Sequence, residues 1–217
     1  MRILIIYGTT EGHTRKLSEF AAAALREAGH EVQATEAPED ATGLDPSAWD
    51  AVIVAASLHI GRYQPAVVQF TRMHRDALAR VPSAFISTSL SAVGANPDDL
   101  EGLEECVAKF REETLWTPGA VHHAAGAIRY SHYDFFKRLV LKFIARKRGK
   151  ETVTSRDYDL TDYEALKRFV VGFAGTAALG RVPPGAPPCC GTARPRLTAS
   201  APDAARRHCV SGPGQSL

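Results

Sequence analysis

The sequence has little charge imbalance and no long hydrophobic run. Its 217 residues carry 26 lysines and arginines against 24 acidic residues, a formal net charge of +2. So small a net charge gives no whole-chain argument for nucleic-acid binding, and we predict no nucleic-acid partner. No apolar run approaches the roughly 18 residues of a transmembrane helix, and the first, Ile3–Tyr7, is too short for a signal peptide. We therefore expect a cytoplasmic protein that can still lie against a membrane.

Cysteine is scarce. Of the four cysteines, Cys106 lies alone in the body of the chain, and the other three fall near its end. Their spacing matches no zinc-binding pattern, so no metal site is predicted. We expect unpaired thiols in a reducing compartment.

Strand and helix patterns alternate along the body of the chain. Continuous apolar runs typical of buried strands are separated by segments with apolar residues at helical spacing. The predicted strands are Arg2–Tyr7, Glu31–Thr35, Ala51–Ala56, Pro82–Thr88 and Gly119–Ile128. The predicted helices are Glu11–Ala28, Pro65–Leu78, Pro97–Glu113 and a last one from Thr161 to about Ala178. This order predicts an α/β fold with a doubly wound, five-stranded parallel sheet, whose ligands bind beyond the carboxyl ends of the strands.

Two segments do not fit this alternation. Residues 129–159 are too many for an ordinary connection before the last helix. Residues 181–217 contain seven prolines and four glycines but few large apolar residues, a composition typical of disorder. We predict one domain over residues 1–180, with an insert at about 129–159, followed by a disordered tail at 181–217.

The turn after the first predicted strand has the composition of a phosphate-binding loop. Threonine hydroxyls and a glycine precede a helix, whose N-terminal N–H groups attract phosphate. The turn lacks the lysine of the GxxxxGK[ST] loop and the GxGxxG pattern of dinucleotide sites, so neither of those sites is predicted. A simple helix cap uses the same residue types and is the alternative. The candidate binding residues are Thr9, Thr10, Glu11, Gly12, His13 and Thr14.

Two further turns are expected at the same edge of the sheet. In the turn after the third strand, Gly61 permits close approach of a flat ring, to which His59, Ile60 or Tyr63 would offer a face. The turn after the fourth strand is small and polar enough for its backbone to contact a heterocycle. A mobile loop with incidental aromatic residues is the alternative. The candidates are Ser57, His59, Ile60 and Gly61 in one turn, and Ser89, Leu90, Ser91 and Ala92 in the other.

The insert is both basic and apolar. Over residues 129–150, eight basic side chains face a single acid, Asp134, and nine aromatic or aliphatic residues lie among them. A helix over about 134–147 would place apolar side chains on one side and cations on the other, which favours contact with an anionic membrane or a lipophilic substrate. Packing on the body and nucleic-acid binding are the alternatives. The candidates for substrate or membrane contact are Arg129, Tyr130, Lys137, Arg138 and Lys142.

Together these motifs resemble the flavodoxin-like, quinone-dependent protoporphyrinogen IX oxidases of bacteria. The resemblance covers about residues 2–175 and includes the first turn, Ala55–Tyr63, Pro82–Phe85, Gly126–Tyr130 and Gly149–Thr152. It implies a flavodoxin-like fold with a basic amphipathic insert before the last helix, and FMN as cofactor. It also implies oxidation of protoporphyrinogen IX to protoporphyrin IX in haem biosynthesis, with a respiratory quinone as electron acceptor, at the cytoplasmic face of the cell membrane.

The sequence assigns no catalytic base. His59, His122, His123 and His132 are candidates by residue type alone, and a structural or solvent-exposed role is favoured for each. A flavodoxin-like NAD(P)H:quinone reductase or electron carrier is the alternative function, although carriers are usually strongly acidic and residues 1–180 hold 21 basic and 23 acidic residues. A phosphoacceptor receiver domain would need an aspartate where this chain has Ser57. The quinone and the oligomeric state, including a homo-oligomer, stay open.

Overall fold

The computed structural model describes residues 1–40, 43–90, 92, 97–128 and 158–179. The elements that it describes belong to one unit, Met1–Arg181. The predicted tail at 181–217 and nearly all of the predicted insert lie outside the described residues, so both stay predictions.

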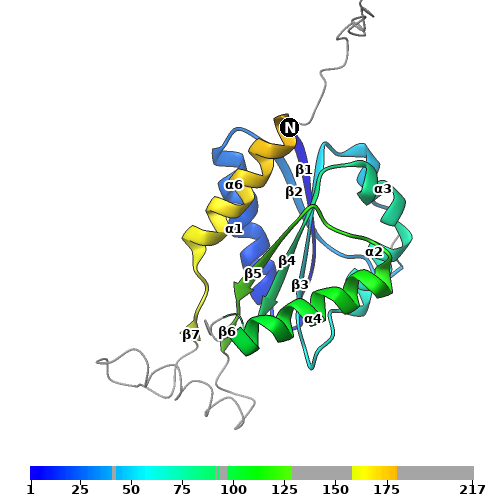
Figure 1. The fold of residues 1–217 in the computed structure, drawn as a ribbon. Helices are drawn as coiled ribbons and strands as arrows, with labels where there is room; N and C mark the ends of the chain where they lie inside the picture. Colours follow the sequence, from blue (N-terminus) through cyan, green and yellow to red (C-terminus); the bar gives the residue numbers. More distant parts are fainter. Residues whose placement is uncertain (41–42, 91, 93–96, 129–157, 180–217) are drawn as a thin grey trace, which may run out of the picture. The chain divides into compact units, whose positions relative to one another are not determined.

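A five-stranded parallel sheet forms the centre of this unit (Figure 1). The strands are β1 (Arg2–Gly8), β2 (Glu31–Glu36), β3 (Ala51–Ser57), β4 (Ser83–Ser89) and β5 (Ala120–Ala125). Their spatial order is β2-β1-β3-β4-β5, which is the doubly wound order of flavodoxin-like folds. The predicted fold class is therefore confirmed.

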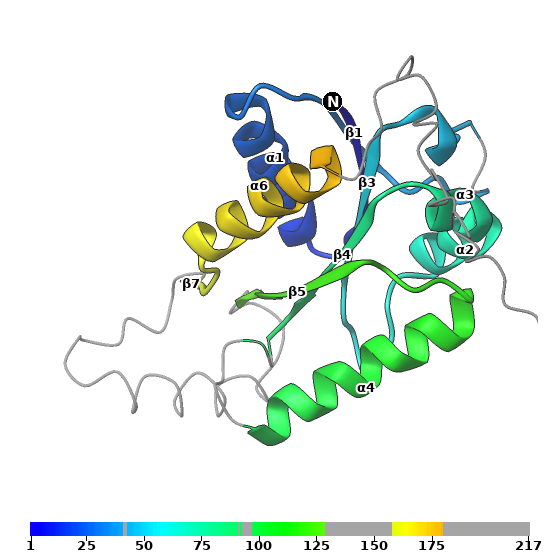
Figure 2. The same cartoon turned by 45° about the horizontal axis from the view of Figure 1, so that its top comes forward.

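Helices cover both faces of the sheet (Figure 2). One face packs against α1 (His13–Glu27) and α6 (Tyr163–Leu179). The other packs against α2 (Pro65–Met73), α3 (Arg75–Arg80) and α4 (Pro97–Thr114), and a short 3₁₀ helix, η1 (Pro46–Ala48), precedes β3. The central strands are therefore apolar on both faces, as the continuous runs predict: along β1, Ile3 and Ile5 face α1, whereas Leu4 and Ile6 face α2.

Most element boundaries lie within two residues of the predictions, and three departures have a local cause. Helix α1 begins at His13 rather than Glu11, because Gly12 has a left-handed φ of 82° that cannot continue a helix. The predicted helix Pro65–Leu78 is divided in two at His74, whose ψ of 14° departs from helical values. The predicted strand Gly119–Ile128 is divided at Gly126: its N–H makes the last hydrogen bond of the parallel ladder, to Ser89 O at 2.9 Å, and the next two residues pair with β7 (Tyr158–Asp159) instead.

A second, two-stranded sheet lies at the two ends of the insert. β6 (Ala127–Ile128) pairs antiparallel with β7 (Tyr158–Asp159), with Ala127 opposite Asp159. We call residues 125–128 and 158–161 the insert root. The pairing places the two ends of the insert side by side, next to the end of β5.

Candidate functional site

Three predicted turns meet at the carboxyl edge of the sheet. In the register, Gly8 of β1 pairs with Ala56 of β3, and Ser57 pairs with Thr88 of β4. The three strands therefore end at nearly the same level, and the turns after β1, β3 and β4 follow on neighbouring strands. Leu58 N–H donates to Thr88 O at 2.8 Å, so the second turn begins against β4.

The turn after β1 leaves the N-terminus of α1 open. Gly12 N–H donates to Thr9 Oγ1 at 2.9 Å, and no side chain caps the first helical turn. Thr14 is fully buried, and its Oγ1 has no hydrogen-bond partner among the described residues. A helix N-terminus with unused donors and a buried hydroxyl without a partner is suited to bind an anion.

Gly8 allows α2 to approach the end of β1 closely. A Cβ atom added at Gly8 would lie 2.5 Å from Val67 Cγ2 and 3.1 Å from Gln64 Cβ, which is too close for any larger residue without rearrangement. This glycine is not among the predicted binding residues. Its position at the end of an apolar strand, directly before the threonine turn, was the available signal.

Gln64 connects the turns after β1 and β3, and it too was missed. Its Nε2 donates to Thr10 Oγ1 at 3.1 Å and also to Ser57 Oγ, while its Oε1 accepts from Ser57 N–H at 3.0 Å. No motif identifies such a residue in advance, because its partners become neighbours only when the two strands pair. Gln64 therefore holds the two turns at a fixed separation.

Residues 59–62 form a tight hairpin in the turn after β3. His59 and Arg62 exchange two backbone hydrogen bonds, of 2.8 and 3.0 Å, across the central residues Ile60 and Gly61. Both central residues have positive φ, 49° and 74°, as in a type I′ turn. Ile60 is fully exposed at the tip, although a β-branched residue is strained in this conformation.

Tyr63 does not face a ligand. It is 7% exposed and packs edge-on against Phe85 and Phe110. Its hydroxyl lies 2.8 Å from Ser87 Oγ, and burial raises the pKa of Tyr63 to about 12. The interpretation of Tyr63 as one face of a ring site is therefore wrong, because the residue directly after the hairpin lies in the core.

The turn after β4 closes on the end of β5. Ala92 N–H donates to Ser89 Oγ at 3.2 Å, and a Cβ atom on Gly126 would lie 3.4 Å from Leu90 Cδ2. Ser91 lies outside the described residues. The turn is thus compact and next to the insert root, as a backbone contact to a heterocycle would require.

The imidazole of His13 is hydrogen-bonded to the insert root. The Thr161 hydroxyl donates its proton to Ala125 O at 2.8 Å. Its oxygen therefore accepts the hydrogen bond from His13 Nε2–H, 3.0 Å away. Burial lowers the pKa of His13 and favours the neutral ring. Only the backbone N–H of His13 is left for an anion, and its side chain instead connects α1 to the insert root.

A second connection joins the insert root to α1. Lys16 Nζ lies 2.7 Å from Asp159 Oδ2, which also accepts from the Tyr163 hydroxyl. Partial burial opposes ionisation of Asp159, but these hydrogen bonds and that from Thr161 N–H outweigh it and hold the pKa of the carboxyl well below its usual range. The predicted contact residues beyond the root lie outside the described residues: Arg129, Tyr130, Lys137, Arg138 and Lys142.

The sequence matches the Flavodoxin domain family over residues 4–155. It is 32% identical over 173 residues to protoporphyrinogen IX dehydrogenase (quinone) of Escherichia coli K12, covering 78% of this chain and 92% of that protein. The chain belongs to the flavodoxin-like protoporphyrinogen IX dehydrogenase family. A protein of the same name from Leishmania major is 28% identical over 80% of this chain and 74% of its own length. The predicted family and oxidoreductase class are confirmed.

The fold of this family member is also found among solved structures. A short-chain flavodoxin associated with a non-canonical PDU bacterial microcompartment aligns with a TM-score of 0.50 and 14% identity. The alignment covers 82% of this chain and 99% of that flavodoxin, and it supports the fold alone. In the part of the chain that the structure describes, no helix is long and apolar enough to cross a membrane.

The two histidines of β5, His122 and His123, are held by structural contacts and are not placed as catalytic bases. His122 stacks on Phe169 with ring centroids 4.9 Å apart, and burial lowers its pKa. His123 Nε2 lies 3.0 Å from Glu104 Oε1. Both belong to β5, where they pack against the helices, and His132 lies outside the described residues. The structural role favoured for His122 and His123 agrees with these contacts.

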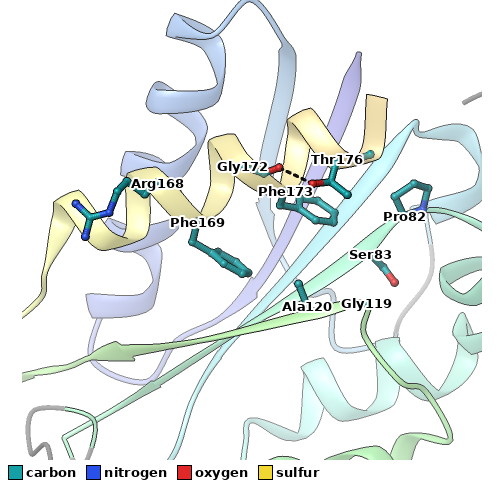
Figure 3. Close-up of a pocket in the computed structure, with 10 residues that line it drawn as sticks. Pro82, Ser83, Gly119, Ala120, Arg168, Phe169, Gly172, Phe173 and Thr176 are labelled. Atoms are coloured by element: carbon teal, nitrogen blue, oxygen red, sulfur yellow. Dashed lines mark hydrogen bonds between the residues drawn. The ribbon is translucent and has the colours of Figure 1, made fainter. Parts of the chain in front are cut away.

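A separate hollow of about 540 Å³ lies between α6 and the beginning of β5 (Figure 3). Its floor includes Ser83 and Gly119, and Phe169 and Phe173 border it from α6. Ser83 begins β4 and Gly119 directly precedes β5, so the hollow lies at the amino ends of the strands. The candidate site lies at their carboxyl ends and does not include it.

Proposed function

We propose that this protein is an FMN-dependent enzyme that oxidises protoporphyrinogen IX to protoporphyrin IX, with a respiratory quinone as electron acceptor, in haem biosynthesis. The observation that supports it most is the open anion site at the start of α1, in a chain that aligns with 92% of the E. coli dehydrogenase. The anion site would bind the phosphate group of FMN. The name of the relatives indicates the substrate and the electron acceptor.

The residues of the first turn fit a phosphomonoester. Thr14 Oγ1 is buried without a partner, which costs about 1–3 kcal/mol unless a ligand restores the hydrogen bond. Thr9 and Thr10 Oγ1 each accept a hydrogen bond within the protein, so their hydroxyl protons are left to donate. Because the described turn contains no lysine, backbone N–H groups and hydroxyls would hold the FMN phosphate.

The other two turns would hold the flavin ring. Ile60 would cover one face of the ring from the hairpin tip, where its exposure in the free protein has no structural use. Ser57, His59 and Gly61 would complete this side, and residues 89–92 would meet the ring's polar edge with backbone groups.

FMN, when bound, supplies the two-electron chemistry that accepts hydride from the substrate and passes electrons to the quinone. Conversion of the hexahydro macrocycle to the porphyrin removes six electrons, so three turnovers are needed per molecule. The protein's own residues would hold the phosphate, cover one ring face and admit the macrocycle beside the insert root. Basic residues of the insert, including Lys137, Arg138 and Lys142, are proposed to meet substrate propionates or anionic headgroups at the membrane.

The test is an anaerobic assay of the full chain loaded with FMN. Protoporphyrinogen IX is mixed with a menaquinone analogue, and porphyrin fluorescence is followed against an autoxidation blank. Fluorescence growth that requires both FMN and the quinone is expected. If FMN binds but only NADPH supports quinone reduction, the protein is an NAD(P)H:quinone reductase and the proposed function is refuted. If FMN does not bind, both functions are refuted.

Two parallel measurements test the other proposals about the chain. Cosedimentation with vesicles containing anionic lipid is expected for the full chain, and to weaken when Lys137, Arg138 and Lys142 are together changed to glutamate. Deletion of residues 181–217 is expected to leave FMN affinity unchanged, because we assign the whole function to residues 1–180. A loss of flavin binding in the truncated chain would contradict that domain assignment.

A further inference from the structure

The hairpin after β3 presents two side-chain donors on one face. His59 and Arg62 are directly opposed and exchange both backbone hydrogen bonds. Opposed residues of an antiparallel pair project to the same side, with their Cβ atoms about 5 Å apart. Both side chains are exposed, and Arg62 forms no ion pair with any residue that the structure describes.

The tip of the same hairpin is apolar and strained. Type I′ turns favour asparagine or glycine at the position of Ile60, because an L residue at positive φ costs about 1–2 kcal/mol. Ile60 is nevertheless fully exposed, so the folded protein gains no burial from it. A strained apolar tip beside a guanidinium forms a surface that matches a ligand with a flat apolar ring and carboxylate substituents.

The hairpin is also held in place relative to the phosphate turn. Gln64, two residues after Arg62, is hydrogen-bonded to Ser57 at the end of β3 and to Thr10 in the phosphate turn. The anion site at the start of α1 already supplies donors for a phosphate. The cation of Arg62 is therefore available for a second anionic group on another molecule.

We propose that Arg62, with His59 beside it, binds a propionate of the porphyrinogen and sets the orientation of the macrocycle against the flavin. The assignment rests on the proposed function and goes beyond it by naming the residue that recognises the substrate's carboxylate. A guanidinium pairs with a carboxylate through two parallel hydrogen bonds, which fixes direction as well as affinity. Ile60, proposed above to cover the flavin ring, lies two residues before Arg62 in the same hairpin, so a carboxylate bound by Arg62 would lie beside that ring.

The experiment compares Arg62→Gln with wild type on two substrates, protoporphyrinogen IX and its dimethyl ester, using the FMN-loaded full chain. For the diacid, KM is expected to rise about tenfold with kcat and FMN affinity unchanged. For the diester, which has no carboxylate, the two proteins should have equal KM. The KM of Arg62→Lys for the diacid should lie between those of wild type and Arg62→Gln, because lysine keeps the charge but loses the planar pair of donors.

A binding measurement and a matched control complete the test. The FMN-loaded proteins are also titrated with protoporphyrin IX, and the porphyrin fluorescence is followed. Without turnover, wild type should bind the porphyrin most tightly, Arg62→Lys less tightly and Arg62→Gln least tightly. Arg72→Gln serves as control, since Arg72 is an exposed arginine in the last turn of α2, away from the carboxyl edge of the sheet. It should change neither KM nor porphyrin affinity.

Four results would overturn the assignment. An unchanged KM for the diacid would show that Arg62 does not contact the substrate, and an equal loss on diacid and diester would show an effect unrelated to the carboxylate. Weaker FMN binding by Arg62→Gln would place the arginine on the cofactor. If wild type neither oxidises the porphyrinogen nor binds the porphyrin, while FMN binds, the proposed function itself fails and the assignment with it.

Discussion

Gln64 donates a hydrogen bond from its side-chain amide to Thr10 Oγ1 at 3.1 Å, joining the turn after β3 to the turn after β1. The same amide bonds both the backbone N–H and the hydroxyl of Ser57. One side chain thus connects the predicted phosphate site with the predicted ring site. Because FMN would contact both turns, the connection prepares the site before the cofactor arrives.

Replacing Gln64 by alanine should weaken FMN binding about tenfold. The variant loses the hydrogen bonds that fix the two turns and leaves Ser57 N–H without its partner, at a cost of about 1–2 kcal/mol. Quenching of FMN fluorescence during titration gives the Kd. Gln69→Ala, at an exposed position of the same helix, is the control and should keep wild-type affinity. Equal affinities for all three proteins would show that the turns need no connection.

Replacing Thr14 by valine should separate folding from cofactor binding. The Thr14 hydroxyl is buried without a partner, so its removal should leave the free protein as stable or slightly more stable. Loss of a donor to the phosphate should weaken FMN binding about tenfold. Ser18→Ala removes another buried hydroxyl without a partner, one turn along α1, and should change stability alone. Calorimetry and FMN titration check both; an unchanged FMN affinity in Thr14→Val would place the phosphate elsewhere.

Replacing Ile60 by asparagine should stabilise the free protein while weakening flavin binding. Asparagine tolerates the positive φ that strains isoleucine, so the free energy of unfolding should rise by about 1 kcal/mol. The apolar contact to the ring would be lost. Urea denaturation of the FMN-free protein and FMN titration measure the two effects. A fall in stability would mean that Ile60 packs against the protein, contrary to its exposure.

The Asp159 carboxylate should stabilise the fold fully above about pH 4 and progressively less at lower pH. Its folded pKa lies below the unfolded value near 3.9, so the stabilisation is complete above the unfolded pKa and is lost as the pH falls through the folded one. Asp159→Asn should therefore be less stable by about 1 kcal/mol at pH 7, and the difference from wild type should shrink below pH 4. Asp76→Asn removes an exposed ion pair and should have little effect at any pH. Thermal unfolding between pH 3 and 7 tests this, and a pH-independent difference would show that the carboxylate's charge is irrelevant.

Much of the fold could be predicted because its signals are local. Apolar runs such as Ala51–Ala56 indicate strands covered on both faces, and the alternation with helical patterns leaves few possible topologies. The errors occurred where the backbone conformation of one residue sets a helix boundary. The left-handed Gly12 makes α1 begin later than predicted, and His74 divides the predicted helix over Pro65–Leu78. Such local departures leave the periodicity of neighbouring residues unchanged, so the pattern does not show them.

The candidate site could be predicted less completely than the fold. The threonine turn was recognisable because strand, turn and helix are consecutive in the chain, and the same is true of the exposed Ile60–Gly61 pair. Tyr63, three residues after Ile60, was misplaced because an aromatic residue after a strand suits a ring site and a core equally well. Only the packing of Phe85 and Phe110 around it decides between them.

The sequence by itself determined the α/β class, the positions of three turns at one edge of a parallel sheet, and the family, since each depends on residues that are close in the chain. The tertiary structure alone decided which side chains those turns share. Gln64 meets Thr10 because β1 and β3 pair, and His13 meets Thr161, 148 residues away, because α1 packs beside α6, which begins just after Thr161. Hydrogen bonds are short-ranged and directional, so partners distant in sequence are defined only when the chain is folded.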